Sequence, residues 1–201
     1  MKRAVSVLGL LMLFAAINMG ATISFFTILS GANENPPVAS LGAGAALVTY
    51  DNILHTLVVR AVFGGLTGTT TMAHIHCCVD PPGNVGVATF PGNFPGFPLG
   101  VTSGTYDNTL APLTPIDLTS QTSYTAGFLN TFGGGTAAGA ETALITGMLA
   151  GRSYFNIHST FAPGGEIRGT LAQIVPEPAT FSLVGGVLLI AAVYQIRRKR
   201  A

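Results

Sequence analysis

Charged residues are scarce in this sequence. They make up 8% of its 201 residues, and six of the nine Lys and Arg residues lie in the two end segments. Residues 26–174, between those segments, hold three arginines against seven carboxylates, a formal balance of −4. Because neutralising phosphates requires clustered Lys and Arg, this composition excludes a nucleic acid as a partner.

Cysteine is limited to the adjacent pair Cys77 and Cys78. With no third cysteine, a vicinal disulfide, an intermolecular bridge and two free thiols all remain open in an oxidising compartment. The sequence also shows no Ser-His-Asp or Cys-His-Asn arrangement of the kind that nucleophilic enzymes use. We therefore expect a protein that is not an enzyme, and a metal-dependent redox enzyme is the alternative.

Glycine and proline contribute 26 and 12 residues, about 19% of the chain, which is below the roughly 25–30% typical of disorder. The apolar content is also too high for a disordered chain. Short alternations rich in Thr, Val and Gly predict one all-β domain over residues 26–174. Within it, residues 53–62 are expected to form a central strand with apolar side chains on both faces. Residues 140–150 are expected to form a short amphipathic helix, preceded by a weaker helical turn around residues 124–131.

The N-terminus has the pattern of a secretory signal. Met1, Lys2 and Arg3 precede a 14-residue apolar run, AVSVLGLLMLFAAI. A short basic start followed by an apolar core of this length is typical of a signal peptide. We assign the signal helix to residues 1–25, with cleavage between Gly20 and Phe26, and expect the protein to be exported.

The C-terminus contains a second apolar segment. Residues 179–196 form an 18-residue stretch, near the lower limit of about 17 for a transmembrane helix. Four basic residues follow it directly: Arg197, Arg198, Lys199 and Arg200. The positive-inside bias keeps such a cluster in the cytoplasm, which leaves the preceding domain outside the membrane.

Pro176, Glu177 and Pro178 stand just before this helix. The Pro-Glu-Pro motif, the apolar helix and the basic cluster together resemble the PEP-CTERM sorting signal of Gram-negative bacteria, here residues 175–201. That resemblance implies an exosortase, a membrane protease-transpeptidase, as a partner. It also implies membrane anchoring before processing and delivery afterwards to the cell envelope or extracellular matrix, where an exopolysaccharide is a candidate partner.

Two histidines, His74 and His76, stand one residue apart in the stretch TMAHIHCCVD (residues 71–80). In a strand they point to the same face, roughly 6.5–7 Å apart along the chain. Both imidazoles can therefore converge on one ion, and imidazole suits copper or zinc. The pattern resembles the copper ligands of copper/zinc superoxide dismutase, which is a local analogy only.

A short internal repeat brings in a third histidine. IHCCVDPPGNV (residues 75–85) aligns without gaps with IHSTFAPGGEI (residues 157–167), each reading as strand, Pro-Gly turn, strand. The repeat predicts two neighbouring strands that place His158 beside the first pair, with Cys78 as a fourth candidate ligand. The alternative is that the three histidines only form hydrogen bonds at the end of the domain.

Three segments resemble the CHRD domain family: LSGANENPPV (29–38), GLTGTTTMAHIH (65–76) and YFNIHSTFAPGGEIRGTL (154–171). The resemblance spans nearly all of residues 27–172. It implies an immunoglobulin-like antiparallel β-sandwich, an architecture that superoxide dismutase also has, and it implies no established enzymatic reaction. In the last block, Glu166 and Arg168 alternate onto one strand face, where each is expected to pair with the other or with a neighbour.

The end segments give the first prediction. In a host that has an exosortase, we expect the exported protein to lack the residues from about Pro178 onward, because the sorting protease cleaves at this signal. Mass spectrometry of the exported protein measures its C-terminus, with an exosortase-deficient host as control. An intact Arg-Arg-Lys-Arg tail in both hosts would instead indicate an ordinary membrane anchor.

Overall fold

The structure, a computed structural model, describes residues 22–175. The predicted sorting signal and almost all of the predicted signal peptide lie outside these residues. Strand β1 begins at Thr22 and buries Phe25 in the core, so a boundary after residue 25 would cut the first strand. Within residues 22–175, no helix is both long and apolar enough to cross a bilayer.

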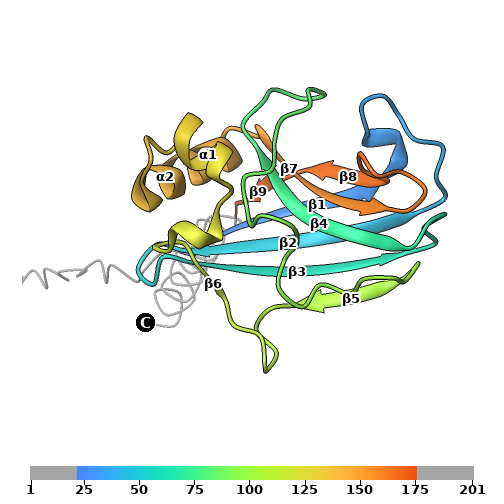
Figure 1. The fold of residues 1–201 in the computed structure, drawn as a ribbon, viewed down its shortest axis with the longest axis horizontal. Helices are drawn as coiled ribbons and strands as arrows, with labels where there is room; N and C mark the ends of the chain where they lie inside the picture. Colours follow the sequence, from blue (N-terminus) through green and yellow to red (C-terminus); the bar gives the residue numbers. More distant parts are fainter. Residues whose placement is uncertain (1–21, 176–201) are drawn as a thin grey trace, which may run out of the picture.

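Strands dominate the described chain, and two short helices interrupt them (Figure 1). The strands are β1 (Thr22–Ser30), β2 (Ala43–Asp51), β3 (Thr56–Gly64), β4 (Thr70–Cys77), β5 (Gly104–Asp107), β6 (Ile116–Asp117), β7 (Ser153–Ser159), β8 (Ile167–Thr170) and β9 (Ala172–Ile174). The helices are α1 (Ala126–Thr131) and α2 (Ala137–Leu149), with 3-10 turns η1 (Gly31–Asn33) and η2 (Gln121–Ser123).

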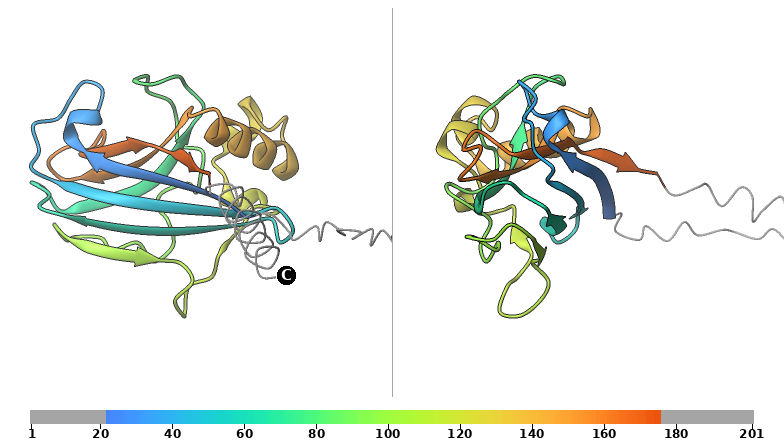
Figure 2. Two further views of the ribbon diagram at one scale, coloured as in Figure 1. Left: turned by 180° about the vertical axis from the view of Figure 1, so that it is seen from behind. Right: turned by 90° about the vertical axis from the view of Figure 1, so that its right-hand side faces the viewer.

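The strands form one curled sheet in the order β4-β7-β8-β1-β2-β3-β5, with β6 paired to β3 and β9 paired to β1 (Figure 2). Each of these strand pairs is antiparallel. The prediction of a mostly antiparallel all-β domain is confirmed. The immunoglobulin-like or superoxide-dismutase-like sandwich stays a prediction.

Strand β3 lies inside the sheet between β2 and β5, as expected for a central strand. Its side chains alternate, and Leu57, Val59, Ala61 and Phe63 point into the core. The predicted start at residue 53 is wrong, because β3 begins at Thr56, and on its other face Arg60 and Val62 are exposed. The residues before it form the hairpin turn, where the Asp51 carboxylate accepts hydrogen bonds from the backbone N–H groups of residues 53 and 54.

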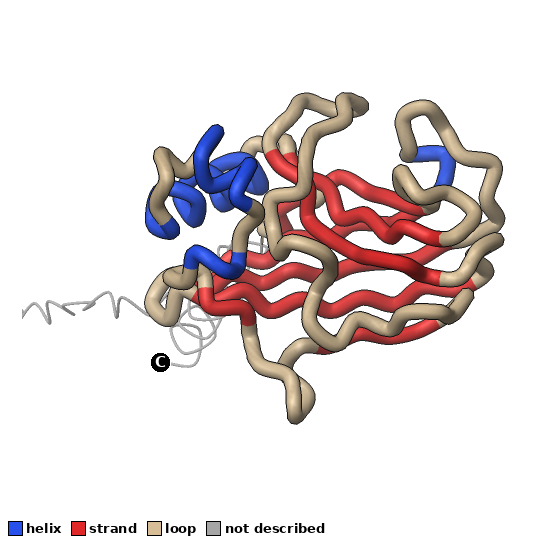
Figure 3. The backbone as a smooth tube through the Cα atoms, viewed as in Figure 1, coloured by secondary structure: helices blue, strands red, loops and turns tan. Residues whose placement is uncertain are grey.

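The predicted helix is present as α2, and its Ala140, Leu144 and Met148 are buried at the expected spacing of four residues. A second helix, α1, lies at the expected helical turn, so the described chain contains two short helices and not one. Figure 3 shows both helices gathered at one end of the sheet. Side-chain hydroxyls cap the two helices: Thr125 accepts from Phe128 N–H and Thr136 accepts from Gly139 N–H.

Glu166 is fully buried at the turn before β8. Its carboxylate accepts hydrogen bonds from the Ser40 and Ser159 hydroxyls and from the backbone N–H groups of Thr67 and Gly68. Desolvation raises the pKa of this carboxyl, but the hydrogen bonds together hold it below its usual value. Glu166 therefore joins three separate segments and does not pair with Arg168.

This network gives a stability prediction. Glu166→Gln replaces one accepting oxygen with an N–H₂ group that faces other donors, so we expect the free energy of unfolding to fall by about 3 kcal/mol. Urea unfolding measures the loss. Asp80→Asn, at a largely exposed carboxylate, is the matched control and should change stability by less than about 0.5 kcal/mol. Equal stability of the two variants would contradict the role assigned to Glu166.

Candidate metal centre

The pairing of β4 with β7 brings three histidines together. In this antiparallel register Met72 faces His158, His74 faces Asn156, and His76 faces Tyr154. All six side chains lie on one face of the two strands, because alternate residues share a face. The alternate residues of β4, which are Ala73, Ile75 and Cys77, point into the core.

The three imidazoles form a compact and almost fully buried group. The ring centroids of His74 and His158 are 5.1 Å apart, and those of His76 lie 5.7–5.8 Å from the other two. One nitrogen from each ring lies within 4.8 Å of the corresponding nitrogens of the other two. Only 3%, 7% and 6% of His74, His76 and His158 is exposed.

Backbone carbonyls fix the protonation pattern of all three rings. Each ring has one nitrogen in contact with a loop carbonyl: His74 Nε2 with Gly92 at 2.8 Å, His76 Nδ1 with Val85 at 2.8 Å, and His158 Nδ1 with Pro163 at 2.9 Å. A carbonyl oxygen only accepts hydrogen bonds, so each of these nitrogens carries the proton. In the neutral rings, Nδ1 of His74 and Nε2 of His76 and His158 are therefore free of protons.

These three unprotonated nitrogens face one another. His74 Nδ1 and His158 Nε2 are 3.3 Å apart, and His76 Nε2 is buried with no hydrogen-bond partner among the described residues. Lone pairs at such separations repel unless a proton or a cation lies between them. Two nitrogens bound to one ion at about 2.0–2.1 Å in tetrahedral geometry are roughly 3.3 Å apart. The arrangement fits a metal ion coordinated by three imidazoles.

Burial favours the neutral rings that a metal ion requires. It lowers the pKa of His74 and of His76 to about 4, and hydrogen bonds to Gly92 and Val85 only partly oppose this shift. Burial also lowers the pKa of His158. A proton shared between the rings is thus disfavoured near neutral pH.

Cys78, the fourth candidate ligand, is not in this group. Strand β4 ends at Cys77, so the alternation that places His74 and His76 on one face does not extend to residue 78. Cys78 forms a disulfide with Cys77, and its sulfur lies 3.6 Å from the Ala143 carbonyl of α2. A disulfide sulfur is not the thiolate that binds metal ions.

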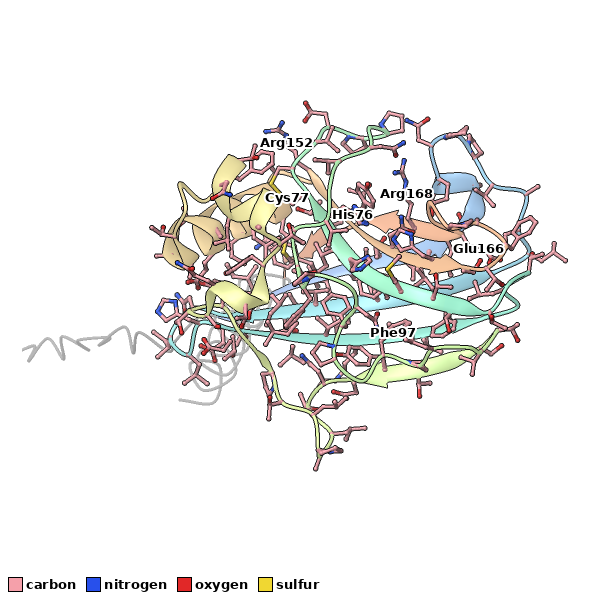
Figure 4. The ribbon with its side chains drawn as sticks, viewed as in Figure 1. His76, Cys77, Phe97, Arg152, Glu166 and Arg168 are labelled. Atoms are coloured by element: carbon pink, nitrogen blue, oxygen red, sulfur yellow. A yellow bond between two sulfur atoms is a disulfide. The ribbon has the colours of Figure 1, made fainter. Side chains whose placement is uncertain are left out.

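A stack beside the histidines was not expected from the sequence. The Tyr154 ring lies on His76 with centroids 4.7 Å apart and planes 5° apart, and the Arg168 guanidinium lies 4.6 Å above the Tyr154 ring centroid. Figure 4 labels His76 and Arg168, the two ends of this stack. The Tyr154 hydroxyl also contacts Val85, whose carbonyl accepts from His76. The two-residue period of a strand indicates that Tyr154 and His158 share a face. The stacking of Tyr154 on His76, however, depends on the register in which β4 pairs with β7.

The profile of the CHRD domain family matches residues 25–171. No curated protein and no solved structure matches the chain.

The low pKa values give a pH prediction for the metal-free domain. The folded values of about 4 lie below the unfolded value of 6.5, so the unfolded state takes up protons first as pH falls. We expect His74 and His76 to stabilise the fold fully above pH 6.5 and to lose this contribution progressively towards pH 4. Urea unfolding in the presence of a chelator, from pH 7 to pH 5, measures the slope.

A variant in which His74 and His76 are both glutamine is the comparison, and it should lack this part of the slope. The difference between the two proteins is the readout, because Glu34 acts in the opposite direction. Burial raises the pKa of Glu34 to about 7, so its contribution grows as pH falls. Identical pH profiles would show that the two rings are not held neutral.

Proposed function

The chain belongs to the CHRD domain family, and from its three-histidine centre we propose that it is an exported protein that binds one copper or zinc ion. The role is one of binding or structure in the cell envelope or extracellular matrix, not catalysis. His74 Nδ1, His76 Nε2 and His158 Nε2 supply the ligands. The observation that carries the proposal is the set of three carbonyls that hold the protons on the opposite ring nitrogens.

Carbonyl partners of this kind are what metal-binding histidines normally have. They fix the tautomer, orient the ring and increase its basicity towards the ion. Three imidazole ligands suit either metal, but copper(II) binds a given nitrogen site more tightly than zinc does. We therefore assign copper(II) as the tighter ligand when both ions are supplied.

The burial of the site supports a binding role over turnover. A catalytic metal centre keeps a position open to substrate. Here the segment containing Val85 and Gly92 covers two rings, and the turn containing Pro163 covers the third, so that each histidine is at most 7% exposed. An ion held in this way stabilises the domain and links two loops to the sheet.

A copper- or zinc-dependent redox enzyme is the second candidate. Two observations favour it: three protein ligands leave a fourth coordination position, and only the Tyr154 ring separates Arg168 from His76. Superoxide turnover by the purified copper-loaded domain, lost in His76→Ala, would establish this alternative. Turnover no faster than that of free copper would favour the binding role.

The proposal of export and sorting rests on the two apolar end segments of the sequence and on the Pro-Glu-Pro motif. Strand β9 pairs with β1, with Ile174 opposite Ser24. The described chain therefore begins and ends on neighbouring strands. In this proposal an exosortase removes the C-terminal segment and releases the domain from the membrane to the envelope or matrix.

Metal binding is tested on the purified domain after removal of metal by a chelator. We expect one copper(II) per chain, a higher melting temperature when copper is bound, and an affinity lowered by about 100-fold or more in His74→Ala, His76→Ala and His158→Ala. Titration calorimetry and elemental analysis measure both the affinity and the stoichiometry.

His55→Ala is the matched control, because the fourth histidine lies in the hairpin turn, where it contacts Glu141. This variant should bind copper as the unmodified domain does. Equal losses in His55→Ala and His76→Ala would indicate non-specific imidazole binding and would contradict the site.

A further inference from the structure

A polar cleft lies beside the metal centre on the same face of the sheet. It has a volume of about 520 Å³ and opens between the loop of residues 32–37 and the loop of residues 79–83. Its floor comes from three adjacent strands and includes Thr27, Tyr154 and Thr170. This volume falls within the range of roughly 300–1,000 Å³ typical of small-molecule sites.

Arg168 holds the two walls of the cleft in place. Its guanidinium donates hydrogen bonds to the Asn33 carbonyl at 2.6 Å in one wall and to the Pro82 carbonyl and Asn84 Oδ1 at 2.7 Å in the other. Asn84 Nδ2 then donates to the Asn35 carbonyl at 2.6 Å and joins the walls directly. The cleft is thus formed before any ligand enters, which lowers the entropic cost of binding.

Glu34 in the cleft wall lacks the partners that a buried carboxylate needs. It is 7% exposed, and its Oε1 is fully covered near Gly165 and Asn156, whereas Oε2 retains some exposure and accepts no hydrogen bond from a described residue. The nearest cation, Arg168 Nε, is 3.6 Å from Oε2 and donates to Asn33 instead. Because an unpaired buried acceptor is costly, the ionised form of Glu34 favours a ligand that donates a hydrogen bond to Oε2.

The charges around the cleft exclude a strongly charged ligand. When Glu34 is ionised, its charge offsets that of Arg168, and at the rim Arg152 Nε lies 3.0 Å from Asp80 Oδ1, so that the four groups balance. Several walls are apolar, because Pro37, Pro81 and Pro82 line the cleft. A neutral ligand with many hydroxyl groups and an apolar C–H face matches both properties.

We propose that this cleft binds a neutral sugar unit of a glycan, with Glu34 accepting a hydrogen bond from a sugar hydroxyl and Arg152 donating to a sugar oxygen at the rim. The ring C–H groups pack against the proline walls. Tyr154 contributes to the floor and stacks on His76, so only the Tyr154 ring separates the sugar from His76 of the metal centre. The inference does not depend on metal binding.

Saturation-transfer NMR with the purified domain tests the proposal. The probes are the neutral disaccharides maltose, cellobiose, lactose and diacetylchitobiose at about 10 mM, since single small sites often bind in the millimolar range. Glucuronate and glucosamine are the charged comparators. We expect transfer to at least one neutral disaccharide, and weaker transfer to both charged sugars.

Two variants locate the binding site. Thr170→Trp places a bulky ring on the exposed floor and should abolish transfer, and Arg152→Ala at the exposed rim should weaken binding about fivefold or more. Arg60→Ala, which lies outside the cleft and pairs with Asp107, is the control and should bind as the unmodified domain does. Arg152→Ala keeps the test valid if Thr170→Trp does not fold.

Three results would overturn the proposal: no transfer to any neutral disaccharide, equal transfer in Arg152→Ala and the unmodified domain, or a preference for glucuronate or glucosamine. Copper binding is measured on the same samples. A domain that binds copper but no sugar would refute this inference alone and leave the metal centre intact.

Discussion

Three hydrogen bonds from buried imidazoles to loop carbonyls determine which nitrogen of each histidine can bind a metal ion. Each carbonyl fixes a proton on the outer nitrogen of its ring and leaves the inner nitrogen with a lone pair. The strands alone would only place three polar side chains side by side. The loops that return over the sheet convert them into a set of converging acceptors, which a buried and neutral environment preserves.

The block GGEIRG (residues 164–169) supports this arrangement from one side. Glu166 joins the turn after β7 to two other segments, and Arg168 ties the loops that form the neighbouring cleft. Gly165 has a φ of 133°, and a Cβ there would lie 2.4 Å from Asn156 Nδ2. A side chain at this position would therefore displace Asn156, which stands opposite His74 in the sheet.

The sequence predicted the structure best in the segments that follow the two-residue period of a strand. Period two and the repeat of residues 75–85 in 157–167 are enough to place His74, His76 and His158 on adjacent strands, because burial of one face fixes the register. The position of Cys78 was not predictable, because β4 ends at Cys77 and the disulfide lies beside α2 instead of beside the histidines. The start of β3 was also predicted too early, because the side chain of Asp51 accepts hydrogen bonds from residues 53 and 54 and holds them in the turn before the strand.

The contacts between the loop carbonyls and the histidine rings could not be predicted from the sequence. Val85 and Gly92 belong to segments without a hydrophobic period, and their carbonyls reach the rings only through the path of the whole loop. The partners of Arg168 are likewise distant in sequence, with 135 residues separating it from Asn33. Such contacts follow from the assembled sheet and cannot be read from local patterns.

The central claim is that three specific imidazole nitrogens bind one ion. Electron paramagnetic resonance of the domain loaded with one equivalent of copper(II) tests this most directly, because the copper signal is split by each coordinated nitrogen. The account predicts a single copper species coupled to three imidazole nitrogens, reduced to two in His158→Ala. A spectrum that has no such coupling, or that His158→Ala leaves unchanged, would contradict it.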